Sequence, residues 1–155
     1  MAVISVSRMI HASPSAVFDR VAAVDTWADS IGAITKIEVL TDGPIGVGTR
    51  FRETRVMFGR EVSEEMTLAE LERPTASQPG RMVLEARSHG SFYRTVKTFR
   101  DAGSGQTEYA MEFNAKPEGL MARVLGAVLM PIMKKSVCKA LDGDMDDLKR
   151  ACETA

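Results

Sequence analysis

The stretch that decides the fold is GLMARVLGAVLMPIMKKSVCKALDGDMDDLKRACE, residues 119–153. Residues 119–133 carry a single charge, on Arg123, whereas the part from Lys134 onward is charged and amphipathic. Read as one helix, the stretch would be about 50 Å long at roughly 1.5 Å per residue, far longer than the mean helix. Because its first part is apolar on nearly every face, we expect that part to be buried on nearly every side.

Pro131 lies inside this predicted helix. Proline lacks a backbone N–H and clashes with the preceding turn, so we predict a kink or a break near residues 127–130. Two interpretations stay open: a bend that lets the helix follow a cavity, and a boundary between two separate helices.

The rest of the chain shows the period-two alternation of strands. The pattern predicts strands at residues 2–10, 33–40, 49–58, 61–72, 81–89, 91–100 and 106–115. After the first strand, Ser13 and Pro14 are typical of a helix start and predict a short helix over residues 15–24, and a second short helix carries Trp27. Short glycine-containing links between consecutive strands indicate an antiparallel meander. The predicted fold is α+β: one seven-stranded antiparallel sheet curved around a long C-terminal helix, in a single domain over residues 1–155.

The composition excludes several classes of partner. The net charge of −1 gives no support for nucleic-acid binding. The apolar run 120–133 is shorter than the roughly 20 residues that span a bilayer, so no stable membrane insertion is expected. No secretion signal is recognisable, so we expect a cytoplasmic protein. Two cysteines about 21 Å apart on one helix cannot pair with each other, and two histidines offer no zinc-ligand spacing. We therefore expect no metal and no cofactor.

Four segments together carry a family resemblance: IHASPSAVFDRVAAVDTWADS (10–30), GPIGVGTRFR (43–52), a charged strand ending in ELERP (70–74), and LDGDMDDLKRACE (141–153). They resemble the START/Bet v 1-like (SRPBCC) superfamily, and within it the bacterial polyketide cyclase/dehydrase and lipid-transport proteins. The resemblance implies a helix-grip fold, with a cavity between sheet and helix for lipids, sterols, polyketides or other apolar ligands. The superfamily includes carriers, aromatase/cyclases, hormone receptors and chaperone regulators, so the resemblance constrains the fold more than the chemistry.

The predicted cavity wall consists of apolar residues on the strands and on the terminal helix. These are Phe51, Met66, Leu68, Leu84, Tyr109, Met111, Phe113, Leu125, Val128, Leu129 and Ile132. The alternative for each is ordinary packed core. The face that strands 81–89 and 91–100 turn toward the cavity stays open.

Catalysis in such a cavity would need a general base and a donor that holds an enolate. The candidates are Tyr109, His89, Tyr93 and Glu53. Strand parity places His89 opposite Leu84, which favours a surface histidine, whereas Tyr109 shares a face with Met111. No local motif pairs a nucleophile with a base.

Two charged groups have a functional and a structural interpretation. Asp142, Asp144, Asp146 and Glu153 fit positions of a calcium loop, but apolar residues keep helical spacing through this segment, which favours a helix with a solvated acidic face. Arg55 could hold an acidic ligand, although cross-strand ion pairs on a solvated face are the simpler interpretation.

These observations favour a protein that binds or transports a small hydrophobic or amphipathic molecule without catalysis. One alternative is a cyclase or dehydratase that acts on a polyketide-like ligand. A second alternative is a protein-interaction module. The sequence leaves the ligand and the oligomeric state open.

Overall fold

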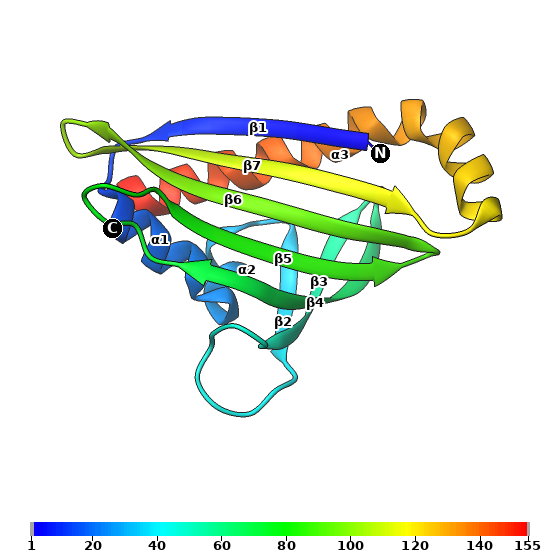
Figure 1. The fold of residues 1–155 in the computed structure, drawn as a ribbon, viewed down its shortest axis with the longest axis horizontal. Coiled ribbons are helices and arrows are strands. Elements are labelled where there is room, and N and C mark those ends of the chain that lie inside the picture. The colour runs from blue at the N-terminus through cyan, green and yellow to red at the C-terminus, as the bar shows by residue number, and fades with distance from the viewer. Residues whose placement is uncertain (1, 155) are drawn as a thin grey trace.

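A computed structural model describes residues 2–154, which form seven strands and a long C-terminal helix (Figure 1). The strands are β1 (Ala2–Ile10), β2 (Ile34–Val39), β3 (Arg50–Met57), β4 (Arg60–Glu72), β5 (Gly80–Ser88), β6 (Ser91–Gly103) and β7 (Gln106–Pro117). The helices are α1 (Pro14–Ala22), the 3-10 turn η1 (Val24–Thr26), α2 (Trp27–Ser30) and α3 (Leu120–Glu153).

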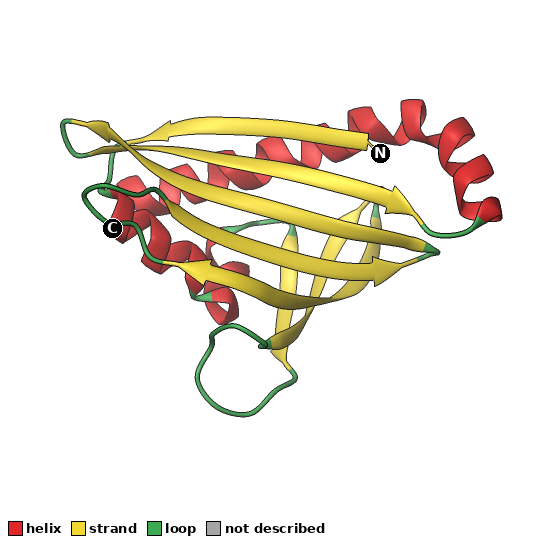
Figure 2. Ribbon diagram, viewed as in Figure 1, coloured by secondary structure: helices red, strands yellow, loops and turns green. Residues whose placement is uncertain are grey.

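The seven strands form one antiparallel sheet in the order β1-β7-β6-β5-β4-β3-β2. The chain order is therefore a meander from β2 to β7, and β1 pairs with the last strand. Figure 2 shows the long strands on one side of the helices and the short helices gathered at one end. This arrangement confirms the predicted α+β helix-grip fold.

The short helices form where the sequence places a cap. The Ser13 side chain accepts a hydrogen bond from the Ala16 backbone N–H at 3.2 Å, and Pro14 is the first helical residue. The helix α1 ends at Ala22, two residues before the predicted end. The Trp27 indole N–H donates to the Val21 carbonyl at 2.9 Å and so fixes α2 against α1.

The packed core lies at the end of the sheet that α1, α2 and the second half of α3 cover. Phe99 is central to it, with its ring 5.3 Å from Phe18 and 5.2 Å from Tyr109. From α3, Met145 and Leu148 enter the same cluster. Burial of these large side chains supplies most of the free energy that holds the helix on the sheet.

The helix α3 is continuous but bent. Pro131 lies within it, and Figure 1 shows the helix changing direction in its first half. A boundary between two helices is therefore excluded. The bend does not let the helix follow the cavity either, because none of residues 120–133 lines it. Residues 120–133, which we call the arm, point away from the sheet.

The expectation that the arm is buried on nearly every side was wrong. Apart from the half-buried Met130, its large apolar side chains are between 41% and 79% exposed. The physical reason is that an apolar helix is buried only where another surface is within reach, and the bend directs the arm beyond the end of the sheet.

Candidate functional site: a cavity between the sheet and the long helix

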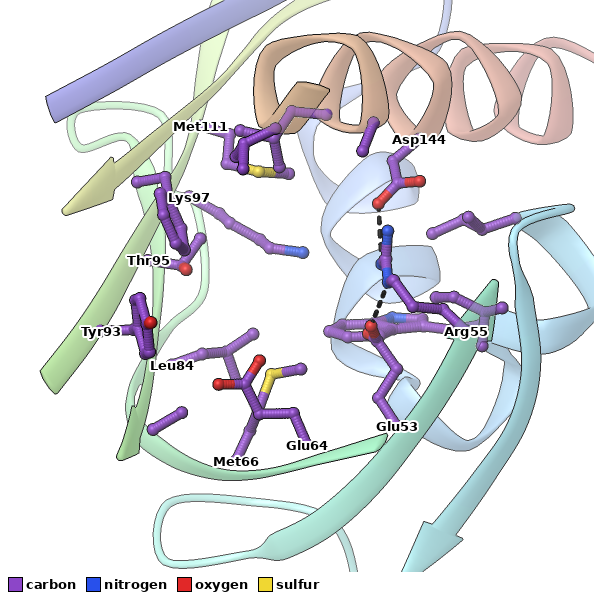
Figure 3. A pocket seen from close by; sticks show the side chains of 18 of the residues that line it. Glu53, Arg55, Glu64, Met66, Leu84, Tyr93, Thr95, Lys97, Met111 and Asp144 are labelled. Carbon is purple, nitrogen blue, oxygen red and sulfur yellow. Dashed lines mark hydrogen bonds and ion pairs between the residues drawn. The ribbon is translucent and has the colours of Figure 1, made fainter. Parts of the chain in front are cut away.

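A cavity of about 200 Å³ lies between the sheet and the second half of α3. Figure 3 shows its walls, which combine apolar side chains with an unusual number of ionisable ones. The labelled wall residues are Glu53, Arg55, Glu64, Met66, Leu84, Tyr93, Thr95, Lys97, Met111 and Asp144.

The strand β6 turns one face into the cavity. Tyr93, Thr95 and Lys97 line it at period two, as side chains on one face of a strand must. On β5, Leu84 and Ala86 line the same cavity. The sequence did not decide which face of these two strands lines the cavity. The structure shows that it is the face that carries these five residues.

A buried ion cluster joins the sheet to α3. Arg55 donates to the Glu53 carboxylate at 2.5 Å and to the Asp144 carboxylate at 2.9 Å. Burial opposes the charge of Arg55, but the two neighbouring carboxylates outweigh it and raise its pKa above the ordinary value. The arginine is thus permanently charged, and the cluster fixes α3 over the cavity.

The position of Asp144 corrects the expectation of a fully solvated acidic face. Asp144 is only 7% exposed, because helical spacing places it beside Leu141 and Leu148 on the inward side. Burial raises the pKa of Asp144, and the Arg55 charge opposes this shift. The side chains of Asp142 and Asp146 are in contact with solvent as expected, and both hold Arg8 of β1. Since residues 142–153 are all helical, they form no calcium loop.

The Lys97 side chain points its ammonium into the cavity (Figure 3). It is 7% exposed, and among the described residues its ammonium has no hydrogen-bond or ion-pair partner. Its nitrogen lies 4.3 Å from the centre of the Trp27 ring, which stabilises the charge in part. Burial lowers the pKa of Lys97 to about 8, although the charges of Glu53 and Asp144 oppose this shift.

Glu64 and Tyr93 add further polar groups to the cavity wall. Burial raises the pKa of Glu64, and the negative charge of Glu53 adds to this effect. The Tyr93 ring stacks on Phe113 at 5.6 Å. Together with Lys97, these groups can hold a ligand oxygen and can exchange protons with it.

Several predicted site residues do line this cavity. They are Met66, Leu84, Tyr109, Met111 and Phe113 among the apolar set, and Glu53, Tyr93 and Tyr109 among the polar candidates. Burial raises the pKa of Tyr109, so its hydroxyl stays protonated and can donate a hydrogen bond.

Other predicted residues lie elsewhere. Phe51 and Leu68 are fully buried in the core and do not border the cavity. His89 is exposed in the turn between β5 and β6, with φ 50°. The four arm residues Leu125, Val128, Leu129 and Ile132 are exposed and do not line the cavity. Because of the bend, α3 supplies Val137, Ala140 and Leu141 instead.

Lys97 and Thr95 were missed by sequence reasoning. A usable signal was present, since Lys97 shares strand parity with Tyr93 and Phe99. A lysine on the same strand face as two aromatic residues indicates an inward ammonium. Arg55 was considered as a clamp for an acidic ligand, but its two partners are carboxylates of the protein itself.

Comparison with known proteins supports the fold. Residues 1–153 match the family model described as polyketide cyclase/dehydrase and lipid transport. The crystal structure of TTHA0849 from Thermus thermophilus superposes with a TM-score of 0.74 at 16% identity, covering 97% of both chains. No curated protein matches the chain in sequence.

Two further solved structures share the architecture. The Zhui aromatase/cyclase from Streptomyces sp. R1128 has a TM-score of 0.71 at 12% identity, covering 98% of this chain and 93% of its own. Ara h 8.0201 has a TM-score of 0.62 at 15% identity, covering 99% of both chains. Identities this low establish a common fold and leave the chemistry to the cavity itself.

Proposed function

Because the chain belongs to the polyketide cyclase/dehydrase and lipid transport family, we propose that it binds a small amphipathic molecule in the cavity beneath α3. The observation that carries this proposal is the ammonium of Lys97, which points into the cavity from a side chain that is only 7% exposed and forms no ion pair in the described part of the chain. The nearby charges of Glu53 and Asp144 offset its desolvation only in part. Burying a charge costs free energy unless a hydrogen-bond acceptor or an opposite charge compensates it. An oxygen atom of a bound ligand would be such an acceptor.

The size of the cavity narrows the ligand class. Its volume of about 200 Å³ exceeds the roughly 150 Å³ in which a cavity accepts benzene, and lies below the roughly 300–1,000 Å³ of typical small-molecule sites. The proposed ligand is therefore a compound of one or two rings, or a short chain, that carries a carbonyl, hydroxyl or carboxylate group. A sterol would not fit without expansion of the cavity.

A matched ligand pair tests this proposal. We would measure binding of 2-acetylnaphthalene and 2-ethylnaphthalene by isothermal titration calorimetry, since the two differ only in the carbonyl oxygen. A hydrogen bond to a charged group is worth about 1.5–3 kcal/mol, so the acetyl compound should bind at least about 10-fold more tightly. In Lys97→Met the two should bind equally.

A cavity-filling variant provides the second arm of the test. Ala86 lines the cavity, so Ala86→Phe should abolish binding of both compounds. The control is the same substitution at Ala102, which is exposed in β6 and should bind as the wild type does. Undiminished binding to Ala86→Phe would contradict the proposal.

Catalysis by the same groups is the second candidate function. It is favoured by one observation: the environment of Lys97 and Glu64 shifts the pKa of each toward its neutral form. Ionisable groups with pKa values shifted in this way are common at proton-transfer sites. A cyclase or dehydratase would remove a proton next to a ligand carbonyl, with Lys97 or Glu64 as the base.

Hydrogen exchange of the ligand separates catalysis from binding. In D₂O, an active cavity should exchange the methyl protons of 2-acetylnaphthalene faster than buffer does, as measured by NMR. Exchange should fall to the buffer rate in Glu64→Gln if that carboxyl is the base. If the protein binds the ligand but does not accelerate exchange of its methyl protons, the result supports a carrier and contradicts catalysis.

A further inference from the structure

The arm of α3 presents its large apolar side chains to solvent. The exposed stripe repeats at helical spacing and consists of Leu120, Met121, Val124, Leu125, Val128 and Ile132. The exposed fractions reach 79% at Leu120 and 65% at Val128. A helix of a globular protein normally directs such a stripe toward the core, so this one is oriented for something outside the fold.

The inward side of the arm begins with small residues. Ala122 and Gly126, followed by Met130, recur every fourth position and are half-buried. A Cβ added to Gly90 would lie 3.3 Å from the Ala122 Cβ, so the arm rests against the β5–β6 turn by its small face. The branched residues of the stripe therefore point away from the protein because of how the arm is seated.

The arm and the turns that follow it are strongly cationic. Arg123, Lys134, Lys135 and Lys139 are exposed, and no acidic residue occurs between Glu118 and Asp142. None of the four forms an ion pair with any described residue. The whole chain has a net charge of −1, so positive charge is concentrated on Arg123 in the arm and on the three lysines that follow the arm.

The exposed apolar stripe and the neighbouring cations together indicate what kind of partner binds the arm. A second copy of the chain would bring two such cationic segments together, which like-charge repulsion opposes. An anionic lipid surface satisfies both properties, since headgroups attract the cations and the acyl boundary accepts the stripe. No helix in the described residues is long and apolar enough to cross a membrane, so the arm would lie in the plane of the bilayer.

We propose that the arm docks this protein onto an anionic bilayer, with the apolar stripe in the lipid interface and the four cations on the headgroups. Beyond the arm, α3 continues into the cavity wall through Val137, Ala140 and Leu141. The docked arm is therefore continuous with the part of α3 that lines the cavity. The exchange of an amphipathic ligand between bilayer and cavity rests on the proposed function, whereas the docking itself does not.

Vesicle flotation of the full chain tests docking. We expect binding to vesicles of equal parts phosphatidylcholine and phosphatidylglycerol, weak binding to phosphatidylcholine alone, and release by high salt. Lys134→Gln with Lys135→Gln should weaken binding about 30-fold, at about 1 kcal/mol for each cation. The charge control is Lys36→Gln with Arg100→Gln, which removes two exposed cations outside α3 and should change little.

Two equally exposed valines test the stripe. Val128→Asp should reduce vesicle binding at least about 10-fold, because a valine that enters the interface contributes about 1.5 kcal/mol or more. Val47→Asp changes a valine that is 68% exposed in the loop before β3, against 65% for Val128, and should bind vesicles normally. The indole introduced by Val128→Trp should shift its fluorescence to shorter wavelength on anionic vesicles.

Each other outcome overturns the proposal. Equal binding to neutral and anionic vesicles, or no binding, removes the anionic bilayer as the partner. A dimer seen by light scattering that Val128→Asp dissociates assigns the stripe to a second copy. A loss of folding stability in Val128→Asp but not in Val47→Asp shows that the arm closes onto its own chain. Ala86→Phe should still bind vesicles, so failure of the cavity proposal would remain distinguishable.

Discussion

The two halves of α3 reverse the usual relation between hydropathy and burial. The arm is the most apolar stretch of the chain and is exposed, whereas the charged half from Asp142 onward contains Met145 and Leu148, which are buried. What differs is the surface opposite each half. The second half faces the concave sheet and the short helices, and the arm extends past the β5–β6 turn. The hydropathy of a helix thus indicates how much free energy it would gain by burying its apolar face. The fold decides whether another surface is within reach to bury it.

The same comparison separates the two functional regions. In the buried half, Asp144 shares a charge network with a cavity, and its desolvation is offset by Arg55. In the exposed half, cations without an ion-pair partner in the described chain flank an apolar stripe. Each half therefore has a candidate site where polarity and burial disagree. In the second half a charged residue is buried, and in the arm apolar residues are exposed.

The largest effect is expected where the buried half is joined to the sheet. Arg55→Met leaves Glu53 and Asp144 as buried carboxylates without their common partner, which should lower the free energy of unfolding by about 3–5 kcal/mol. Arg50→Met is the control, because that side chain is 56% exposed, and a surface pair contributes at most about 1 kcal/mol. Urea denaturation of both variants measures the difference, and equal losses would contradict a structural role of the cluster.

A pair of leucines compares the two halves directly. Leu148→Ala should lower the free energy of unfolding by about 2–5 kcal/mol, since it opens a cavity in the core. Leu125→Ala, in the exposed arm, should change it by less than about 0.5 kcal/mol. Chemical denaturation gives both values. A large loss at Leu125 would mean that the arm packs against the protein in solution.

Lys97→Met should stabilise the fold, although it should also abolish the preference for 2-acetylnaphthalene over 2-ethylnaphthalene. Between pH 8 and pH 10.5, the unfolded chain keeps the Lys97 proton while the folded chain releases it, because the folded pKa is about 8 and the ordinary value is 10.5. The unfolded state then binds more protons, so this group makes stability rise with pH across that window, and its penalty is fully present below pH 8. At pH 7 the variant should be more stable by about 1–3 kcal/mol.

The pH dependence itself provides the check on Lys97. From about pH 8 to about pH 9.5 the wild type should gain stability relative to Lys97→Met, by up to about 1.4 kcal/mol per pH unit. Parallel curves for the two proteins would show that Lys97 is not desolvated in the folded state.

The smallest effect on stability is expected where Arg8 contacts the solvent-exposed carboxylates of α3. Arg8→Met removes the partner of Asp142 and Asp146, whose side chains are 49% and 55% exposed. Solvent screens such pairs, so the thermal midpoint near neutral pH should barely change. The Arg8 hydrogen bond lowers the pKa of Asp146 below its ordinary 3.8, so its small contribution is present above that pH and is lost as the pH falls further. A large neutral-pH shift would make this face a structural contact.

Much of the fold could be predicted from the sequence. Alternation predicts the strands, the Ser13–Pro14 pair predicts the start of α1, and glycine links between strands predict the meander. These signals are local, because strand parity, caps and turns depend on residues close together in the chain. The inward residues Tyr109 and Met111 follow from parity in the same way, whereas parity left open which face of β5 and β6 lines the cavity.

The tertiary structure alone decided the rest. Whether the arm is covered depends on the direction that the bend at Pro131 gives it, and whether Asp144 is buried depends on Arg55, which lies 89 positions away in the chain. Lys97 acquires its properties from Trp27 and from the cavity around it. The sequence by itself determined which faces are apolar and which elements form. Their partners in space were decided by long-range packing, because burial and charge compensation are properties of surfaces that meet only after folding.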